Sequence, residues 1–136
     1  MNLVLDASMA LAWILDDENN DANQAILRIV AADGAVVPSL WRLEVANVLQ
    51  HSVRRKRCDQ AFADSGLLLL ERLQILVDHE TDKHAWGETR RLAIEHGLTV
   101  YDAAYLELAL RRGLPIASCD AEMIQAAKSA GVEVII

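Results

Sequence analysis

The sequence predicts an α/β fold in which helices cover both faces of a parallel sheet. Five short runs of strand-forming residues are mainly apolar, as in parallel strands that are buried on both faces. Segments with apolar residues at helical spacing separate these runs. With 136 residues and a hydrophobic content of 53%, the chain can build one continuous core, so we expect a single domain over residues 1–136.

The first elements are a strand and two helices. Leu3–Leu5 is an apolar run that we interpret as a buried strand. Ser8 is suited to cap a helix that extends to about Asp16. After an acidic, Asn-rich turn, apolar residues recur at helical spacing over residues 22–32, and Gly34 stops this pattern.

A second strand leads into a long helix. Ala35–Val37 is the strand, Pro38 closes it, and Ser39 is placed to cap the helix that follows. This helix is expected to reach the basic run at 54–57, because positive charge is favourable at a helix C-terminus. Its predicted core positions are Trp41, Val45, Val48 and Leu49.

The middle of the chain again places a helix before a strand. A helix from about Asp59 precedes the strand Ile75–Val77. Thr81 or Asp82 is expected to cap the next helix, and Gly97 to terminate it.

The last part of the chain supplies two more helices and two more strands. One helix begins around Asp102, with an apolar stripe behind that residue, and precedes the strand Pro115–Ser118. Asp120 begins the last helix and Gly131 stops it. Residues 132–136 then form the fifth strand.

Charge and cysteine content limit the class of function. A net charge of -7 argues against binding nucleic acid by bulk attraction, so nucleic-acid chemistry would need a local basic patch or bound cations. Cys58 and Cys119 form no metal-binding pattern and no disulfide framework, which suits a reducing compartment. The first apolar run is interrupted by Asp6, which argues against a secretory signal peptide, and no apolar stretch in the sequence is long enough to cross a bilayer. We therefore expect a soluble, cytoplasmic protein.

Four carboxylates are placed to meet at one edge of the predicted sheet. Ligands of open parallel sheets bind outside the carboxyl ends of the strands. Asp6 ends the first strand, and Asp120 lies just past the fourth. Glu44 is early in the helix that leaves the second strand, and Asp102 reaches the same edge if its loop folds back over the sheet.

Each of these acids also has a simpler interpretation. An Asp at a strand-to-helix junction is typically a helix cap, and Glu44, in a partly buried stripe, is open to pairing with a cation. Adjacent carboxylates, however, repel one another unless a cation compensates. Oxygen ligands without a His or Cys cluster favour Mg²⁺ or Mn²⁺. Such ions would let an acidic protein act on a phosphate backbone.

Four segments resemble the ordered motifs of PIN-domain ribonucleases, and the similarity is closest to VapC toxins of type II toxin–antitoxin systems. The segments are Leu3-Val-Leu-Asp-Ala-Ser8, Glu44-Val-Ala-Asn47, Thr99-Val-Tyr-Asp-Ala-Ala-Tyr105 and Ile116-Ala-Ser-Cys-Asp120. The resemblance runs across nearly the whole chain, and the Tyr-Asp-Ala-Ala-Tyr element is its most specific part. Cys119 departs from the apolar residue that usually precedes the last Asp.

The resemblance implies a three-layer PIN-like sandwich whose central five-stranded parallel sheet has the order 3-2-1-4-5. It also implies that four acids are the metal ligands and catalytic residues: Asp6, Glu44, Asp102 and Asp120. Three further residues match positions that support such a site through hydrogen bonds: Ser8, Asn47 and Ser118.

The implied activity is that of a toxin endoribonuclease that hydrolyses RNA phosphodiester bonds with Mg²⁺ or Mn²⁺. A cognate antitoxin and a homodimer, formed through apolar helices of the first half, are implied only by the resemblance. The alternative is a non-catalytic PIN-like interaction module whose acidic groove binds a basic segment of a partner protein.

Positively charged residues are candidates for guiding RNA to the acidic edge. The runs are Arg54, Arg55, Lys56 and Arg57, and then Arg111 and Arg112. For the first run, a solvated helix terminus is the simpler interpretation. Trp13, Trp41 and Trp86 occupy apolar helical positions, which favours core or interface packing over base stacking.

Two other enzyme classes use carboxylates on such a sheet and fit this sequence poorly. A haloacid-dehalogenase-type phosphatase requires a second Asp two residues after Asp6, where Ser8 stands. A phosphorelay receiver would use Asp78 as its phosphoacceptor, but it also requires paired acids after the first strand and a Lys after a late strand, and neither is present.

Overall fold

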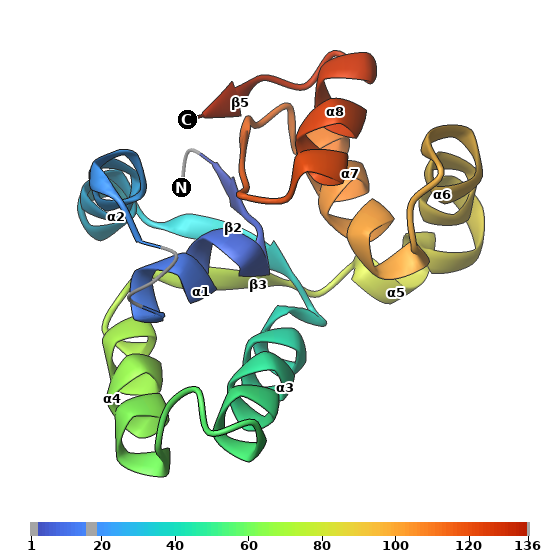
Figure 1. The fold of residues 1–136 in the computed structure, drawn as a ribbon. Coiled ribbons are helices and arrows are strands. Elements are labelled where there is room, and N and C mark those ends of the chain that lie inside the picture. Colours follow the sequence, from blue (N-terminus) through green and yellow to red (C-terminus); the bar gives the residue numbers. More distant parts are fainter. Residues whose placement is uncertain (1–2, 16–18, 136) are drawn as a thin grey trace.

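The computed structural model describes residues 3–15 and 19–135, which include five strands. These form one parallel sheet in the order β3-β2-β1-β4-β5, so the predicted fold class and strand order are both confirmed (Figure 1). The strands are β1 (Val4–Leu5), β2 (Ala35–Pro38), β3 (Ile75–Asp78), β4 (Ile116–Ala117) and β5 (Val134–Ile135). Because β1 is central, Asp6 lies at the middle of the carboxyl edge of the sheet.

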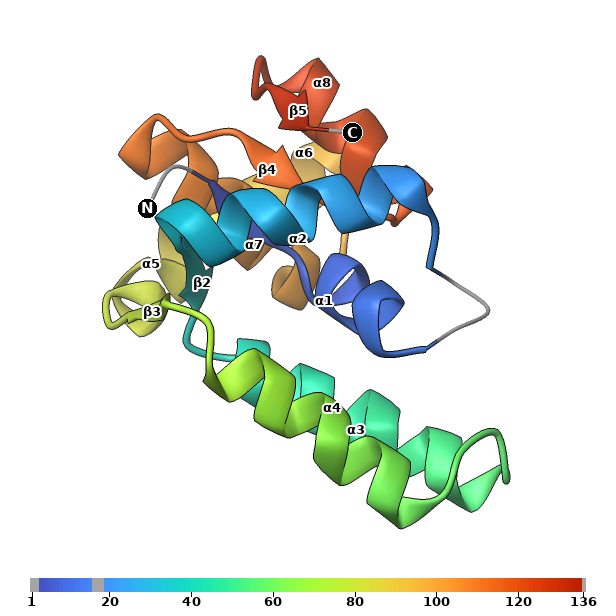
Figure 2. The same ribbon diagram turned by 90° about the vertical axis from the view of Figure 1, so that its left-hand side faces the viewer.

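Helices cover both faces of this sheet. They are α1 (Ala7–Ile14), α2 (Asp21–Asp33), α3 (Trp41–Arg54), α4 (Gln60–Glu71), α5 (Thr81–His84), η2 (Ala85–Thr89), α6 (Arg90–His96), α7 (Val100–Arg112) and α8 (Ala121–Ser129). α7 packs against β1, β2 and β4, with α6 and α8 beside it. Figure 2 shows α1 and α2 in front of the strands and α6 and α7 behind them, which gives three layers. α3 and α4 form a hairpin that packs against α1.

The core lies between the sheet and these helices. Leu5, Val36 and Ile116 of the three central strands are fully buried, and so is Tyr105 of α7. The continuous apolar runs of the sequence therefore reflect strands that are covered on both sides. β3 differs, because it is the edge strand next to β2, and Leu76 at its centre is 53% exposed.

Several predicted helix caps are wrong. Asp6, not Ser8, occupies the N-cap position of α1, and Ser8 lies inside the helix with its hydroxyl directed back to Asp6. Leu40, not Ser39, precedes α3, because two turn residues separate β2 from the helix. The predicted end of the first helix at Asp16 lies outside the described residues.

The segment 81–97 is not the one continuous helix that the sequence predicted. Gly87 has non-helical backbone angles (φ -104°, ψ -105°) and divides the segment into α5, η2 and α6. Neither Thr81 nor Asp82 is the N-cap of α5, because Glu80 holds that position. The predicted stop is confirmed, since Gly97 ends α6 in the left-handed conformation with a φ of +65°.

Two of the predicted core residues, Trp86 and Val48, are exposed. Trp13 and Trp41 are buried as expected, but Trp86 beside the Gly87 kink is 93% exposed and is not a core residue. Val48 of α3 is also exposed, at 37%, because the hairpin packs against α1 along only part of its surface. In the described ranges no helix combines the length and apolar character needed to cross a membrane.

Candidate active site

Asp6 is the centre of the candidate active site. It is 96% buried by surface area, and its Oδ2 accepts 2.7 Å hydrogen bonds from the hydroxyl groups of Ser8 and Ser118. Burial raises the pKa of Asp6 to about 6; the two serine hydrogen bonds oppose this rise, and the charges of Asp102 and Asp120 add to it. Ionised Asp6 is therefore energetically unfavourable in the folded protein.

Ser8 and Ser118 connect Asp6 to the loop that carries Asp120. The Ser8 hydroxyl oxygen accepts a 2.9 Å hydrogen bond from the backbone N–H of Cys119, and the Ser118 hydroxyl oxygen accepts one of 3.0 Å from the N–H of Asp120. The junction between β1 and α1 is thereby tied to the junction between β4 and α8. These contacts are the kind that a supporting role of the two serines requires.

Glu44 extends from the first turn of α3 and meets the buried side chain of Tyr105. The Tyr105 hydroxyl donates a 2.5 Å hydrogen bond to Glu44 Oε1. Burial raises the pKa of Glu44; the hydrogen bond from Tyr105 opposes this rise, and the charges of Asp6 and Asp102 add to it. In the described part of the chain, Glu44 pairs with this hydroxyl and not with a cation.

Asp102 and Asp120 sit at the N-termini of two helices but differ in their local roles. Asp102 is in the first turn of α7, and Thr99 is the N-cap, whose hydroxyl accepts a 3.0 Å bond from the Asp102 N–H. Asp120 is itself the N-cap of α8 and accepts a 3.1 Å bond from the N–H of Glu122. The cap interpretation therefore applies to the Asp120 side chain but not to that of Asp102.

The four predicted acids act on one another electrostatically. Burial raises the pKa of Asp102, the charges of Asp120 and Glu122 raise it further, and a hydrogen bond from Thr99 lowers it. Glu122 is a fifth acid that the sequence reasoning missed. Its position two residues after Asp120, in the first turn of the same helix, is the signal that could have identified it.

The donor set suits a divalent cation such as Mg²⁺ or Mn²⁺. The four predicted side chains offer carboxylate oxygens, and a cation would relieve their mutual repulsion, which adds to the rise that burial causes in the pKa of Asp6. Among residues 3–15 and 19–135, no three Asp, Glu, His or Cys side chains are grouped so that they could hold a metal ion as they stand. Glu44 accepts its hydrogen bond through Oε1 and Asp120 through Oδ1, so the second oxygen of each carboxylate is a potential ligand.

The sheet order and its acidic edge agree with a known family. The sequence profile of the PIN domain matches residues 3–129. The chain belongs to the PIN domain family. The matched region includes all four predicted acids and every strand except β5.

Similar proteins cover nearly the whole PIN domain. Ribonuclease VapC3 of Pyrobaculum aerophilum is 31% identical over 129 residues, which cover 92% of this chain and 94% of the relative. The crystal structure of PAE2754 from the same organism has a TM-score of 0.72 and 26% identity, over 99% of this chain and 91% of that one. The structure of VapBC2 from Rickettsia felis, solved with a promoter DNA fragment bound, shares the fold with a TM-score of 0.67 and 17% identity. The match covers 98% of this chain and 97% of that one.

Asn47 is the third residue for which the sequence predicts a supporting role in this PIN domain. It lies on α3, three residues after Glu44, and its side chain is exposed. Within the described residues it makes no hydrogen bond with the predicted acids. A supporting role for Asn47 therefore stays a prediction from the family resemblance.

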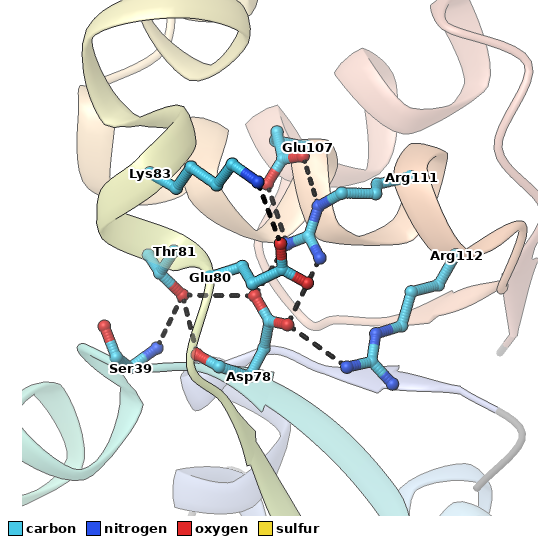
Figure 3. Close-up of polar contacts among 8 residues, drawn as sticks. All are labelled: Ser39, Asp78, Glu80, Thr81, Lys83, Glu107, Arg111 and Arg112. Atoms are coloured by element: carbon cyan, nitrogen blue, oxygen red, sulfur yellow. Dashed lines mark hydrogen bonds and ion pairs between the residues drawn. The ribbon is translucent and has the colours of Figure 1, made fainter.

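Arg111 and Arg112, which the sequence suggested as guides for RNA, form ion pairs with Asp78. Both donate hydrogen bonds to the buried carboxylate of Asp78, with Arg111 Nη2 at 2.6 Å and Arg112 Nη2 at 3.1 Å from its oxygens (Figure 3). Arg111 also pairs with Glu107 at 2.7 Å. This cluster, which lies on β3 and α7, fastens the C-terminal half of α7 to the edge strand.

The basic run lies at the far end of α3 from Glu44. Arg54 is the last residue of the helix, and Arg55, Lys56 and Arg57 form the turn toward α4. Glu44 and Arg54 are ten positions apart, which corresponds to about 15 Å along the helix at a rise of about 1.5 Å per residue. The basic run is therefore separated from Glu44 along the axis of α3.

Proposed function

We propose that this PIN domain protein is a divalent-metal-dependent endoribonuclease of the VapC toxin type, with residues 1–136 as its single domain. The observation that supports this most directly is the buried Asp6, whose surroundings include the charges of Asp102 and Asp120 and whose own charge acts on Glu44. The similarity to Ribonuclease VapC3 supports RNA as the substrate class.

The four acids would hold Mg²⁺ or Mn²⁺: Asp6, Glu44, Asp102 and Asp120. The bound ion supplies Lewis acidity toward water and the phosphate. Asp6, with a pKa raised to about 6, would bind after losing its proton, while Ser8 and Ser118 keep its carboxylate in place. The cap formed by Thr99 fixes the first turn of α7 and with it Asp102.

The proposal includes three kinds of partner. RNA would approach the acidic edge, with Arg54, Arg55, Lys56 and Arg57 binding its phosphates away from the reaction centre. A cognate antitoxin would block the acids with a basic segment, and the net charge of -7 supports this. A homodimer would form through helices of the first half of the chain, and the exposed side chains of Leu68 and Leu69 on α4 support this. The protein would act in the cytoplasm.

The test is cleavage of a circular single-stranded RNA by the purified protein, free of any antitoxin. Cutting is expected with Mg²⁺ or Mn²⁺ and not with EDTA, and a circle opens only if the enzyme cuts internally. Asp102→Asn should abolish cutting, while Asp64→Asn, which changes an exposed acid of α4, should leave it intact. If wild-type protein and Asp102→Asn are equally inactive on linear and circular RNA, the nuclease proposal is wrong.

The alternative function is a non-catalytic module whose acidic edge binds a basic segment of a partner protein. Its supporting observation is the same set of carboxylates in a chain with a net charge of -7. In that case a lysine-rich or arginine-rich peptide would bind with an affinity that Asp102→Asn weakens, while no RNA would be cut with either metal.

A further inference from the structure

Tyr105 lies in the middle of α7 and is completely buried. A buried tyrosine hydroxyl needs a hydrogen-bond partner, and here the partner is the carboxylate of Glu44, 61 residues earlier in the chain. Burial raises the pKa of the Tyr105 hydroxyl, so this group keeps the proton that it donates to Glu44; the backbone N–H of Ala7, the residue after Asp6, opposes the rise.

Tyr105 and Asp102 lie on the same side of α7. The two residues are three apart on α7, so they lie on one face of the helix. Tyr105 is therefore hydrogen-bonded to Glu44 in the first turn of α3 and shares α7 with Asp102. It also interacts electrostatically with the β1–α1 junction, which carries Asp6.

Glu44 is the acid that most needs such a contact. Its side chain is longer than that of an Asp, only half-buried, and repelled by the charges of Asp6 and Asp102. Without a donor it would turn toward solvent, away from the other carboxylates. Asp6 does not have this freedom, because two serine hydroxyls already hold it.

We propose that Tyr105 is a positioning residue that holds Glu44 where it can bind the divalent cation together with Asp6 and Asp102. This inference rests on the proposed metal-dependent function. Tyr105 touches neither the substrate nor the cation; it acts only through Glu44 and through the spacing of α3, α7 and the β1–α1 junction.

The test compares Mn²⁺ binding by the full chain and by Tyr105→Phe, measured by titration calorimetry or by the spectrum of free Mn²⁺. The substitution keeps the buried ring and removes only the hydroxyl. The Kd for Mn²⁺ should rise by about 10-fold or more, the range found when partners of metal ligands are removed. In RNA cleavage, the Mn²⁺ concentration for half-maximal rate should rise similarly, while the rate at saturating Mn²⁺ recovers. Tyr101→Phe, on an exposed tyrosine of the same helix, is the matched control and should bind Mn²⁺ like the wild type.

A second comparison separates positioning from general stability. In a Glu44→Gln background, Tyr105→Phe should cause no further loss of Mn²⁺ affinity, because the group it positions is already gone. Additive losses in the double variant, or an unchanged Kd in Tyr105→Phe with a lowered Tm, would overturn the role of Tyr105 and leave the nuclease proposal standing. A wild-type chain that binds no Mn²⁺ would overturn both.

Discussion

Replacing Asp6 with Asn should stabilise the metal-free protein at neutral pH, although it removes the central acid of the site. In the unfolded chain Asp6 ionises near its ordinary pKa of 3.8, whereas burial raises its pKa to about 6 in the folded protein. The folded state therefore holds the proton more tightly, and stability falls as the pH rises from about 4 to above 6. The difference between 3.8 and about 6, at roughly 1.36 kcal/mol per pKa unit, corresponds to about 3 kcal/mol.

Asp6→Asn removes this cost because an amide is neutral at every pH. Its Oδ1 can still accept the hydrogen bonds of Ser8 and Ser118, and its NH₂ group meets the neighbouring carboxylates as a donor. The expected gain in the free energy of unfolding is about 1–3 kcal/mol above pH 7, and close to zero below pH 4, where the wild-type group is protonated.

The measurement is urea unfolding in EDTA at several pH values between 4 and 8, for wild type, Asp6→Asn and the exposed control Asp64→Asn. The wild type and the control should lose stability as the pH rises through 6, and Asp6→Asn should lose less. Addition of Mn²⁺ should then stabilise the wild type more than Asp6→Asn. If Asp6→Asn is less stable than the wild type at pH 7.5 in EDTA, or if the pH profiles coincide, the electrostatic description of the site is wrong.

Three further perturbations test other parts of the molecule. Arg111→Ala should lower the free energy of unfolding by about 3 kcal/mol, because it removes one of the two cations that neutralise buried Asp78; urea unfolding measures this. Gly34→Ala should cost about 1–3 kcal/mol in the same assay, since Gly34 has a φ of +76° and a Cβ would lie 2.6 Å from the carbonyl oxygen of Gln74. Alanine at all four positions 54–57 should raise the KM for RNA without changing kcat. The slope of the logarithm of the RNA-binding constant against the logarithm of salt concentration should become shallower by about 0.7 per lost phosphate contact.

The sheet could be predicted from sequence because its information is local. Leu3–Leu5 and Ala35–Val37 are short and apolar at every position, a pattern typical of strands that are covered on both faces. Asp6 and Asp120 could be assigned to the carboxyl edge because they follow the first and the fourth predicted strands. The strand order came from the family resemblance, because apolar runs alone do not determine which strands are neighbours.

The features that escaped prediction depend on contacts between distant residues or on backbone geometry. Nothing near Tyr105 in the sequence indicates that its hydroxyl meets Glu44, and nothing near Arg111 indicates that it pairs with Asp78, 33 residues earlier. The kink at Gly87 follows from backbone angles that a periodic pattern does not record. Asp78 shows that an acid at the end of a strand need not belong to a metal site, because arginines can neutralise it.

α7 explains how the fold tolerates a cluster of mutually repelling acids. Its first turn carries Asp102, its middle donates from Tyr105 to Glu44, and its last turn is anchored by Arg111 to Asp78. Repulsion among the acids acts to push the N-terminal end of α7 away from the sheet, while the ion pairs near its other end and the buried apolar face resist that movement. Loss of the Arg111 anchor should therefore weaken the fold most where the acids are ionised, so the destabilisation by Arg111→Ala in EDTA should be larger at pH 8 than at pH 5.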